Sequence, residues 1–252
     1  MRLATWNLNN RVGKVRFRPE AAQAVVALSA DLIVLTEYFP QHHHRQFCQV
    51  LAEAGWVHQL MSREPTEVAN RTLVASRAPL EVDVLALPDF DCQLPANIVA
   101  AHLPTFGLRI VGIRVPAYGP SNPLLLRSWE WLETAAAALR ETPAVIMGDL
   151  NVRPSPDRSG VGACFRRLLD NGWQRAAPTG GYSYFGPTGV RSEIDHALAS
   201  PRCKIRGAEY VVSVTGFTLA GAQNALSDHA ALVVDLDINL PQEVIWPEQM
   251  LK

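Results

Sequence analysis

The sequence predicts an α/β (α+β) fold, a four-layer α/β/β/α sandwich in which two mixed β-sheets pack face to face beneath outer helices. The 252 residues are 48% hydrophobic and 19% charged, which supplies enough apolar side chains for a large core. Helical patterns alternate with short apolar runs, and hairpin-like runs follow. There is neither an internal repeat nor a linker-like segment. We therefore expect one domain over residues 1–240, followed by a C-terminal tail over residues 241–252.

Helix signals and strand signals occupy different parts of the chain. Pro19 suits a first helical position, Asn122-Pro123 pairs a cap residue with proline, and Gly55 and Gly172 suit helix ends. The predicted helices are Pro19–Leu28, His44–Ala54, Leu124–Leu139 and Ala163–Asp170. The predicted strands are Arg2–Leu8, Asp31–Leu35, Trp56–Met61, Arg71–Ser76, Leu80–Leu87, Ile98–Leu103, Leu108–Val115, Ala144–Met147, Tyr182–Phe185, Glu193–Ala199, Lys204–Val212 and Ala230–Ile238.

Composition narrows the cellular setting and the class of partner. The formal net charge is -1, so no global basic field attracts long nucleic acid, although a local basic patch remains open. Four scattered cysteines without a CxxC pair fit a reducing compartment, while disulfide pairing stays open. The sequence begins on a strand pattern and carries no apolar run of membrane-spanning length. We expect a cytoplasmic protein without a membrane span, and the sequence leaves the oligomeric state open.

The predicted site is centred on the polar residues that follow the apolar run Val145–Met147. This run ends at Gly148, and Asp149 and Asn151 come next, separated by Leu150. Because side chains alternate along extended backbone, Asp149 and Asn151 point the same way if that geometry persists past Gly148. Leu150 would then turn into the core. A carboxylate beside a neutral amide suits activation of a water next to an oxyanion, whereas such a tetrapeptide alone is usually only a turn.

Other polar residues stand at the ends or beginnings of predicted strands. Antiparallel strands bring their beginnings to the edge where the other strands end, so one rim can gather all of these residues. They are Asn7, Glu37, Asp149, Asn151, Asp195, Asp228 and His229. Four carboxylates in one place repel each other unless a cation or a proton neutralises them. Oxygen ligands favour a hard ion, and we predict Mg²⁺ or Mn²⁺.

Five short motifs occur in an order and spacing that match a known group. They are Thr5-Trp6-Asn7-Leu8-Asn9, Thr36-Glu37, Gly148-Asp149-Leu150-Asn151, Ile194-Asp195-His196 and Ser227-Asp228-His229. From Arg2 to Asp235 the chain resembles the endonuclease/exonuclease/phosphatase superfamily, the group of DNase I, exonuclease III and inositol-polyphosphate phosphatases. Each motif is weak alone, and five in order are specific. The resemblance implies the DNase I-like sandwich and metal-dependent phosphoester hydrolysis.

The resemblance also implies metal ligands and a group that handles the attacking water. Glu37 would be the principal metal ligand, assisted by Asn7 and Asp228. Asp149 would orient or deprotonate the water, and Asn151 would donate a hydrogen bond to a nonbridging phosphate oxygen. These roles fit a reaction in which a metal neutralises the phosphate while donors stabilise the transition state.

A second implied unit is an Asp–His pair. Asp195 would fix the tautomer and orientation of His229, and His229 would contact the phosphate. The sequence leaves open whether Asp149 or His229 accepts the proton from water. His196 follows Asp195 directly and should point to the opposite face, so we do not count it as catalytic.

The chain departs from the abasic-site endonuclease pattern at one strand end. Where those enzymes place Tyr-Val-Pro-Asn, this chain has Arg114-Val115-Pro116-Ala117. Arg114 replaces a phosphate-contacting Tyr, and it is itself a good phosphate clamp. Ala117 removes the Asn, and Tyr118 would partly compensate. The departure argues against a standard abasic-site endonuclease.

Several further residues are substrate candidates with an ordinary alternative. Arg153 and Arg191 are predicted to contact substrate, against the alternative of surface charge. Tyr184, like Tyr182 and Phe185, could stack on a base or a sugar, and an exposed hairpin end is an equal alternative. The run of histidines at 42–44 looks like a metal tract, but consecutive helical positions diverge, so we favour a solvated helix start.

The sequence therefore predicts a divalent-metal-dependent hydrolase of phosphoester bonds, a nuclease or phosphodiesterase that acts on DNA or RNA. The first alternative is a phosphatase or phosphodiesterase for a small-molecule or lipid-headgroup phosphate, which the near-neutral charge favours slightly. The second is an inactive scaffold, which is disfavoured because all seven rim residues are present.

Overall fold

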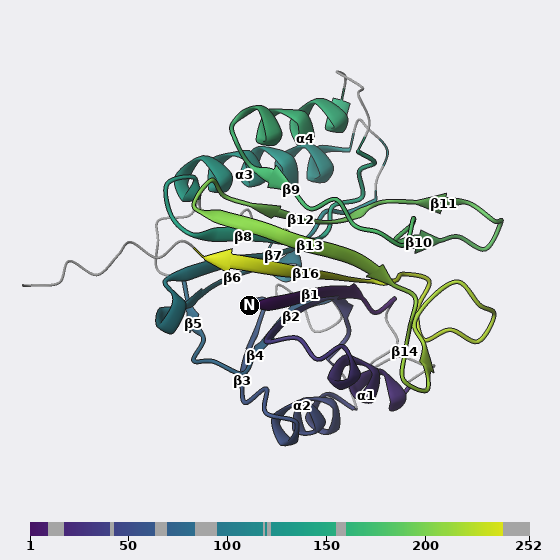
Figure 1. Cartoon of the computed structure of the whole chain (residues 1–252). Coiled ribbons are helices and arrows are strands. Elements are labelled where there is room, and N and C mark those ends of the chain that lie inside the picture. The colour runs from purple at the N-terminus through teal and green to yellow at the C-terminus, as the bar shows by residue number, and fades with distance from the viewer. Residues whose placement is uncertain are drawn as a thin grey trace, which may run out of the picture.

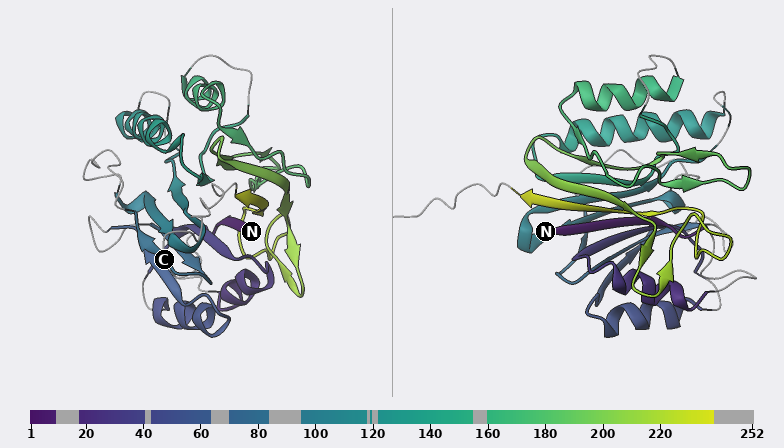
Figure 2. Two further views of the ribbon diagram at one scale, coloured as in Figure 1. Left: turned by 60° about the vertical axis from the view of Figure 1, so that its left-hand side comes forward. Right: turned by 45° about the vertical axis from the view of Figure 1, so that its right-hand side comes forward.

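Two β-sheets pack face to face, and a pair of helices covers the outer face of each (Figures 1 and 2). This computed structural model describes residues 1–9, 18–40, 43–63, 70–83, 95–117, 119, 122–154 and 160–238. The predicted four-layer sandwich is confirmed. The division into a domain of residues 1–240 and a tail stays a prediction, since residues 239–252 lie outside the described part.

Within the described residues, each of the two main sheets is mixed and has six strands. The strands of the first sheet, in spatial order, are β13 (Cys203–Val211), β16 (Ala231–Ile238), β1 (Arg2–Asn7), β2 (Leu32–Tyr38), β4 (Arg71–Ser76) and β3 (His58–Met61). Those of the second are β5 (Glu81–Val82), β6 (Ile98–Leu103), β7 (Leu108–Arg114), β8 (Ala144–Asp149), β12 (Asp195–Ala199) and β9 (Gln174–Arg175). The pairs β1–β2 and β7–β8 are parallel, and the other pairs are antiparallel.

The helices and short elements complete the layers. Helices α1 (Glu20–Ala27) and α2 (His44–Glu53) cover the first sheet, and α3 (Pro123–Leu139) and α4 (Gly160–Asp170) cover the second (Figure 1). The short helices are η1 (Pro95–Asn97) and η2 (Pro104–Phe106). The small hairpins are β10 (Tyr184–Phe185) with β11 (Arg191–Ser192) and β14 (Ser213–Val214) with β15 (Phe217–Thr218).

Three apolar cores hold these layers together. One lies between the first sheet and α1 and α2, one between the sheets, and one between the second sheet and α3 and α4. The run Leu32–Leu35 explains how one strand serves two cores, because Ile33 and Leu35 face the helices and Leu32 and Val34 face the other sheet. Trp129 and Trp131 pack inside the third core.

Most predicted elements are present, with shifted ends. The Asn122 side chain caps α3 by accepting a hydrogen bond from the Leu124 N–H at 2.9 Å. Among the described residues, the predicted strand Leu80–Leu87 is present only as Glu81–Val82, and residues 84–87 lie outside the description. The prediction missed the two-residue strands β9, β11, β14 and β15, which are too short to show a period of two.

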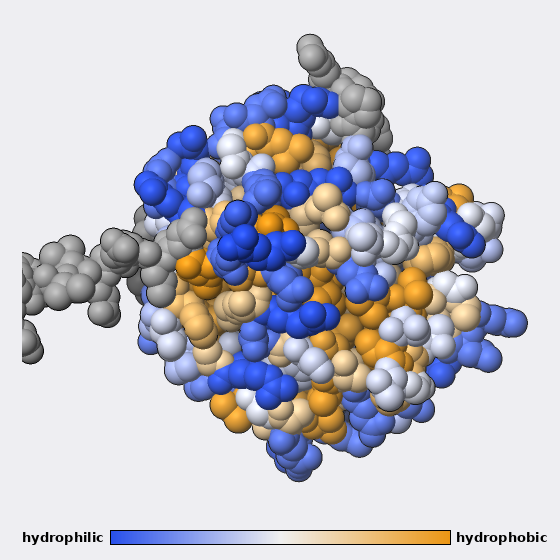
Figure 3. Space-filling model, in the orientation of Figure 1, coloured by the Kyte–Doolittle hydropathy of each residue, from blue (hydrophilic) through white to orange (hydrophobic). Residues whose placement is uncertain are grey.

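The surface seen in Figure 3 is a mosaic of hydrophilic and hydrophobic residues. No helix in the described part of the chain is long and apolar enough to cross a membrane.

Candidate active site

The topology brings six strand ends to one edge of the sandwich. β1, β2, β7 and β8 end there, and the antiparallel strands β12 and β16 begin there. Asp195 lies directly opposite Asp149 in the β8–β12 ladder. A cavity of about 330 Å³ opens at this edge, and Glu37, Arg114, Asp149, Asn151, Asp228 and His229 are among its lining residues. All seven predicted rim residues therefore line this cavity or, as Asn7 and Asp195 do, contact a residue that lines it.

Asp149 is buried and is held by three hydrogen bonds. Its Oδ2 accepts from Asn7 Nδ2 at 2.9 Å and from Asn151 Nδ2 at 3.0 Å, and its Oδ1 accepts from the Asn151 backbone N–H at 3.0 Å. Asn151 Nδ2 also donates to the Val115 carbonyl at 2.7 Å. These contacts fix the carboxylate in one orientation toward the cavity, as a group that positions water requires.

The two polar residues after Gly148 do converge, but not through continued strand geometry. β8 ends at Asp149, and Asn151 has a φ of 48°, in the left-handed region. Leu150 is buried in the third core, as predicted. Asn151 is therefore not extended as predicted. Its left-handed backbone turns the side-chain amide back onto Asp149.

Glu37 also adopts a left-handed conformation, with a φ of 49°, at the point where β2 breaks register against β4. Such a conformation is uncommon for a residue other than glycine and carries a cost in stability. The irregularity directs the Glu37 carboxylate into the cavity, while Thr36 and Tyr38 on either side are buried.

Glu37 forms an ion pair with Arg114 that the sequence did not reveal. Arg114 Nε and an Arg114 terminal nitrogen each lie 2.9 Å from Glu37 Oε1. Both side chains are largely buried, with exposed fractions of 15% for Glu37 and 20% for Arg114. The residue that replaces the Tyr of abasic-site endonucleases therefore contacts the predicted principal metal ligand.

The Asp195–His229 pair has the predicted geometry. Asp195 Oδ2 lies 2.7 Å from His229 Nδ1, and both residues are buried. The His229 backbone is fixed as well, since its carbonyl accepts from Trp6 Nε1 at 2.7 Å and its N–H donates to Ser227 Oγ at 3.1 Å. With Nδ1 taken by Asp195, the opposite side of the ring faces the cavity.

The buried charges shift two pKa values at this edge. Burial and then the charge of Asp195 raise the pKa of Asp149 to about 7, although His229 and Arg114 oppose the rise. Burial alone would lower the pKa of His229, but the charge and hydrogen bond of Asp195, with the charges of Asp149 and Asp228, raise it to about 9. Both shifts act in the same direction, since each favours the protonated form of its group.

Three residues are predicted metal ligands, and their donor set fits a hard ion held partly by water. Glu37 and Asp228 line the cavity, while Asn7 is buried behind Asp149, and its Oδ1 accepts from the Asn9 N–H at 2.9 Å. No cluster of three or more His, Cys, Asp or Glu side chains that could hold an ion occurs among the described residues. Two carboxylates and an amide fit Mg²⁺, which keeps several waters and commonly binds one or two carboxylates.

The predicted substrate residues divide into three groups. Tyr184 lines the cavity, and its ring centroid lies 5.1 Å from that of His229. Arg153 and Arg191 are exposed and do not line this cavity; Arg153 Nε donates to Ser192 Oγ at 3.2 Å. Tyr118 lies outside the described residues, so its placement is not tested.

The other conspicuous histidines lie away from the cavity. The His44 Nδ1 atom is 2.7 Å from the Tyr38 hydroxyl, and His42 lies outside the described residues. His196 points to the helix side of its sheet, as predicted, where its ring packs against Phe165 at 4.9 Å. Burial lowers the pKa of His196 to about 4.

Sequence reasoning missed several residues that build the site. Asn9 and Ile194 line the cavity, and Ser227 Oγ donates to the Asn7 carbonyl at 2.7 Å, which ties the two segments together. Asn9 and Ser227 belong to the recognised motifs, so their position was visible in the sequence. Their contacts were not.

A buried carboxylate aimed at a cavity, a protonated Asp–His pair and a further carboxylate beside them define a class of hydrolase in which water attacks an anionic ester. The family model described as endonuclease/exonuclease/phosphatase family matches residues 4–229. The chain belongs to this family of phosphoester hydrolases, whose members generally depend on divalent metals. A comparison with curated protein sequences found no match.

Solved structures of low sequence identity share the fold. A 3′ phosphatase from Neisseria bound to a product DNA hairpin has a TM-score of 0.70 and 21% identity, covering 94% of this chain and 99% of that one. An AP endonuclease from Archaeoglobus fulgidus has a TM-score of 0.69 and 19% identity, with 94% and 100% covered. An endonuclease/exonuclease/phosphatase from Beutenbergia cavernae has a TM-score of 0.66 and 17% identity, with 94% and 71% covered.

Proposed function

We propose that the protein is a divalent-metal-dependent phosphodiesterase that cleaves nucleic acid, with Mg²⁺ or Mn²⁺ as its cofactor. The observation that carries this proposal is the convergence of Glu37, Asp149 and His229 on one cavity. Two of the similar structures are described as a 3′ phosphatase with a DNA product and an AP endonuclease, which supports a nucleic-acid substrate. The bound metal would neutralise the phosphate and stabilise developing negative charge.

Each residue of the cavity has a proposed role. Asp149 accepts the proton of the attacking water, because a pKa of about 7 suits a general base at neutral pH. His229, whose pKa is about 9, donates a hydrogen bond to the phosphate from Nε2 while Asp195 holds Nδ1. Asn151 Nδ2 donates to a nonbridging oxygen when it exchanges one of its two contacts, with the Val115 carbonyl or with Asp149, for the substrate. Glu37 and Asp228 hold the metal, and Asn7 supports Asp149.

Arg114 and Ala117 separate this protein from the abasic-site pattern. We propose that Arg114 binds the phosphate together with His229, since both line the cavity. The four-residue stretch lacks the Tyr and the Asn of that pattern, so we expect no selectivity for abasic sites. We also propose that the protein acts in the cytoplasm, based on its few scattered cysteines.

A substrate panel tests the proposal. Plasmid DNA, single-stranded oligonucleotide, abasic duplex, RNA, bis-p-nitrophenyl phosphate and inositol phosphates are each incubated with Mg²⁺, Mn²⁺ or EDTA. We expect diester cleavage with metal and none with EDTA. Turnover of monoesters alone would favour the small-molecule or lipid phosphatase, and no turnover of any substrate would favour the scaffold.

Two variants test the proposed roles directly. Glu37→Ala and His229→Ala should each lower kcat by at least about a hundredfold, because each removes an interaction with developing charge. Circular dichroism should show folded protein in both cases. Asp237→Ala, on the exposed end of β16, is the matched control and should keep full activity. Near-normal turnover in either site variant would refute the role assigned to that residue.

A further inference from the structure

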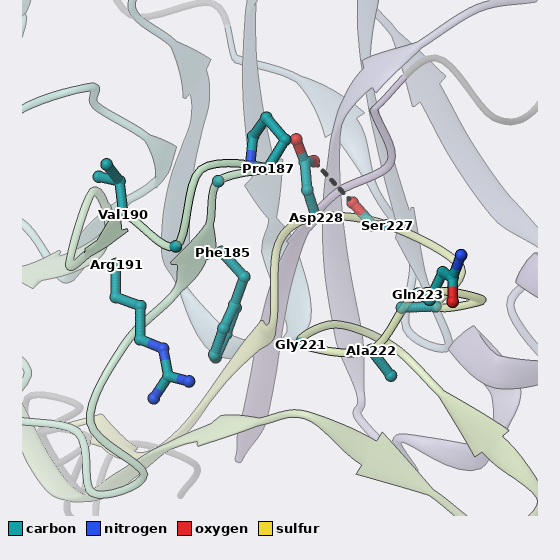
Figure 4. A pocket seen from close by; sticks show the side chains of 12 residues that line it. Phe185, Pro187, Val190, Arg191, Gly221, Ala222, Gln223, Ser227 and Asp228 are labelled. Carbon is teal, nitrogen blue, oxygen red and sulfur yellow. Dashed lines mark hydrogen bonds between the residues drawn. The ribbon is translucent and has the colours of Figure 1, made fainter.

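A second cavity, of about 390 Å³, opens beside the active-site cavity (Figure 4). It lies between the β10–β11 hairpin, which contributes Phe185 and Arg191, and the loop of residues 221–228. Asp228 lines both cavities, so they share one wall residue. A substituent on a phosphate in the first cavity can therefore extend past Asp228 toward the second.

One wall of this second cavity contains the Phe185 ring, and the Arg191 guanidinium lies over that ring. The Arg191 guanidinium carbon lies 5.7 Å from the centroid of the Phe185 ring. A Cβ atom on Gly221 would lie 3.4 Å from that ring, in ordinary van der Waals contact, so the Gly221 backbone lies close to one part of the ring. The Phe185 backbone N–H donates to the Asp228 carbonyl at 2.8 Å, which couples the position of the ring to the active site.

The charges and polar groups of this cavity select among ligand classes. A polyanion such as an inositol polyphosphate would meet the Asp228 carboxylate opposite Arg191, which disfavours it. An aliphatic chain would desolvate the Arg191 guanidinium and the Gln223 amide without pairing them. A planar heterocycle fits this lining better, because its face can stack on the Phe185 ring and its edge can accept from and donate to the Gln223 amide.

We propose that this cavity binds the nucleobase of the nucleotide whose phosphate occupies the active site. The inference rests on the proposed function. It narrows the substrate class from phosphodiesters in general to nucleotides that carry a base next to the scissile bond. Because stacking on an aromatic ring tolerates every base, the cavity should favour the presence of a base rather than one sequence.

Paired substrates test this assignment. One single-stranded oligonucleotide carries all of its bases, and its partner carries a tetrahydrofuran residue in place of the nucleotide at the cleaved bond. The readout is the ratio of kcat/KM for the two substrates. The wild-type protein should prefer the complete oligonucleotide by about tenfold or more, and Phe185→Leu should remove most of that preference. Phe106→Leu, a half-buried phenylalanine in η2 at the opposite end of the sandwich, should keep it.

A binding measurement separates this inference from the proposed function. Amide chemical shifts of Gly186, Gly189 and Gly221 are followed as thymidine 5′-phosphate or ribose 5-phosphate is added in Mg²⁺. Shifts with the base-bearing ligand alone support the cavity even if no diester is cleaved. Equal cleavage of the paired oligonucleotides, or equal shifts with both ligands, would overturn the assignment and leave phosphodiester hydrolysis intact.

Discussion

At the residue scale, Arg114 contacts the proposed metal ligand Glu37 and also lines the cavity in which a phosphate would bind. Its guanidinium neutralises Glu37 at 2.9 Å, and the same group lines the cavity where a phosphate would bind. A cation paired with a metal ligand competes with the metal for that carboxylate. With Glu37 as the proposed metal ligand, Arg114 would stabilise the metal-free protein at the expense of metal affinity and would offer its charge to the substrate.

Replacing Arg114 should separate these effects. In Arg114→Gln, the Kd for Mn²⁺ without substrate should fall by about fivefold, since a charge-assisted hydrogen bond no longer opposes binding. The KM for a diester should rise, because a phosphate contact is lost. Isothermal titration gives the Kd. Arg153→Gln, an exposed arginine that contacts the neutral Ser192, serves as the control and should leave the Kd unchanged. Weaker metal binding in Arg114→Gln would mean that Arg114 orients Glu37 instead.

Asp195 controls the ionisation of both proposed proton-handling groups. Its charge raises the pKa of His229 and also that of Asp149. In Asp195→Asn, burial should dominate at His229, so its pKa should drop from about 9 to below the ordinary value of 6.5. Proton NMR titration of the ring in metal-free protein measures this value.

The raised pKa of His229 also determines whether the folded protein gains or loses stability as the pH rises. His229 has a raised pKa in the folded protein, so its contribution is complete below about pH 6.5 and is lost as the pH rises through about 9. Asp195→Asn should remove this decline from the pH dependence of the melting temperature. Asp235→Asn, an exposed carboxylate beside Arg2, should preserve it. An unchanged His229 titration in Asp195→Asn would contradict the coupling.

At the element scale, the end of β8 depends on Gly148. Its φ is 146°, and a Cβ atom there would lie 1.9 Å from the Ile113 carbonyl oxygen of β7. The close approach keeps the parallel β7–β8 pair in register up to Arg114 and Asp149. Two active-site side chains therefore depend on one position that lacks a side chain.

A single methyl group at this position should disrupt the ladder. Gly148→Ala should lower the melting temperature by roughly 10 °C, the shift that about 3 kcal/mol produces in a chain of this size. Differential scanning calorimetry measures it. Gly119→Ala is the control, because no atom of the described residues lies within 4 Å of its added Cβ, and it should melt with the wild-type protein. Equal melting temperatures for the two variants would show that β7 moves freely to admit the side chain.

The sequence predicted the features that depend only on hydrophobic periodicity and on where a residue falls relative to a strand. The runs that became β2 and β8 predicted buried strands, and the polar residues after them predicted the rim. The ion pair of Arg114 with Glu37 was not predictable, since it joins strands from different sheets through side-chain conformations that no local pattern encodes. The left-handed backbone of Glu37 was equally hidden, because glutamate does not signal such a turn as glycine or asparagine does.

At the scale of the whole molecule, the site exists only when both sheets are docked. Asn7 in the first sheet donates to Asp149 of the second sheet. Asp195 of the second sheet holds the ring of His229, which precedes β16 of the first. The inter-sheet core therefore fixes the relative positions of the proposed base and the proposed phosphate donor.

The number of cationic side chains that can contact phosphates determines how strongly salt should affect the reaction. The formal net charge is -1, and the arginines in or beside the two described cavities are Arg114, Arg153 and Arg191. Each phosphate neutralised on a single strand contributes about 0.7 to the slope of log K against log salt, so three contacts give a slope of about −2. We expect kcat/KM on a single-stranded oligonucleotide to follow that shallow slope between low and physiological salt. Arg153→Gln should reduce its magnitude by about 0.7. A slope of about −5 or steeper would instead require an extended basic surface along the nucleic acid.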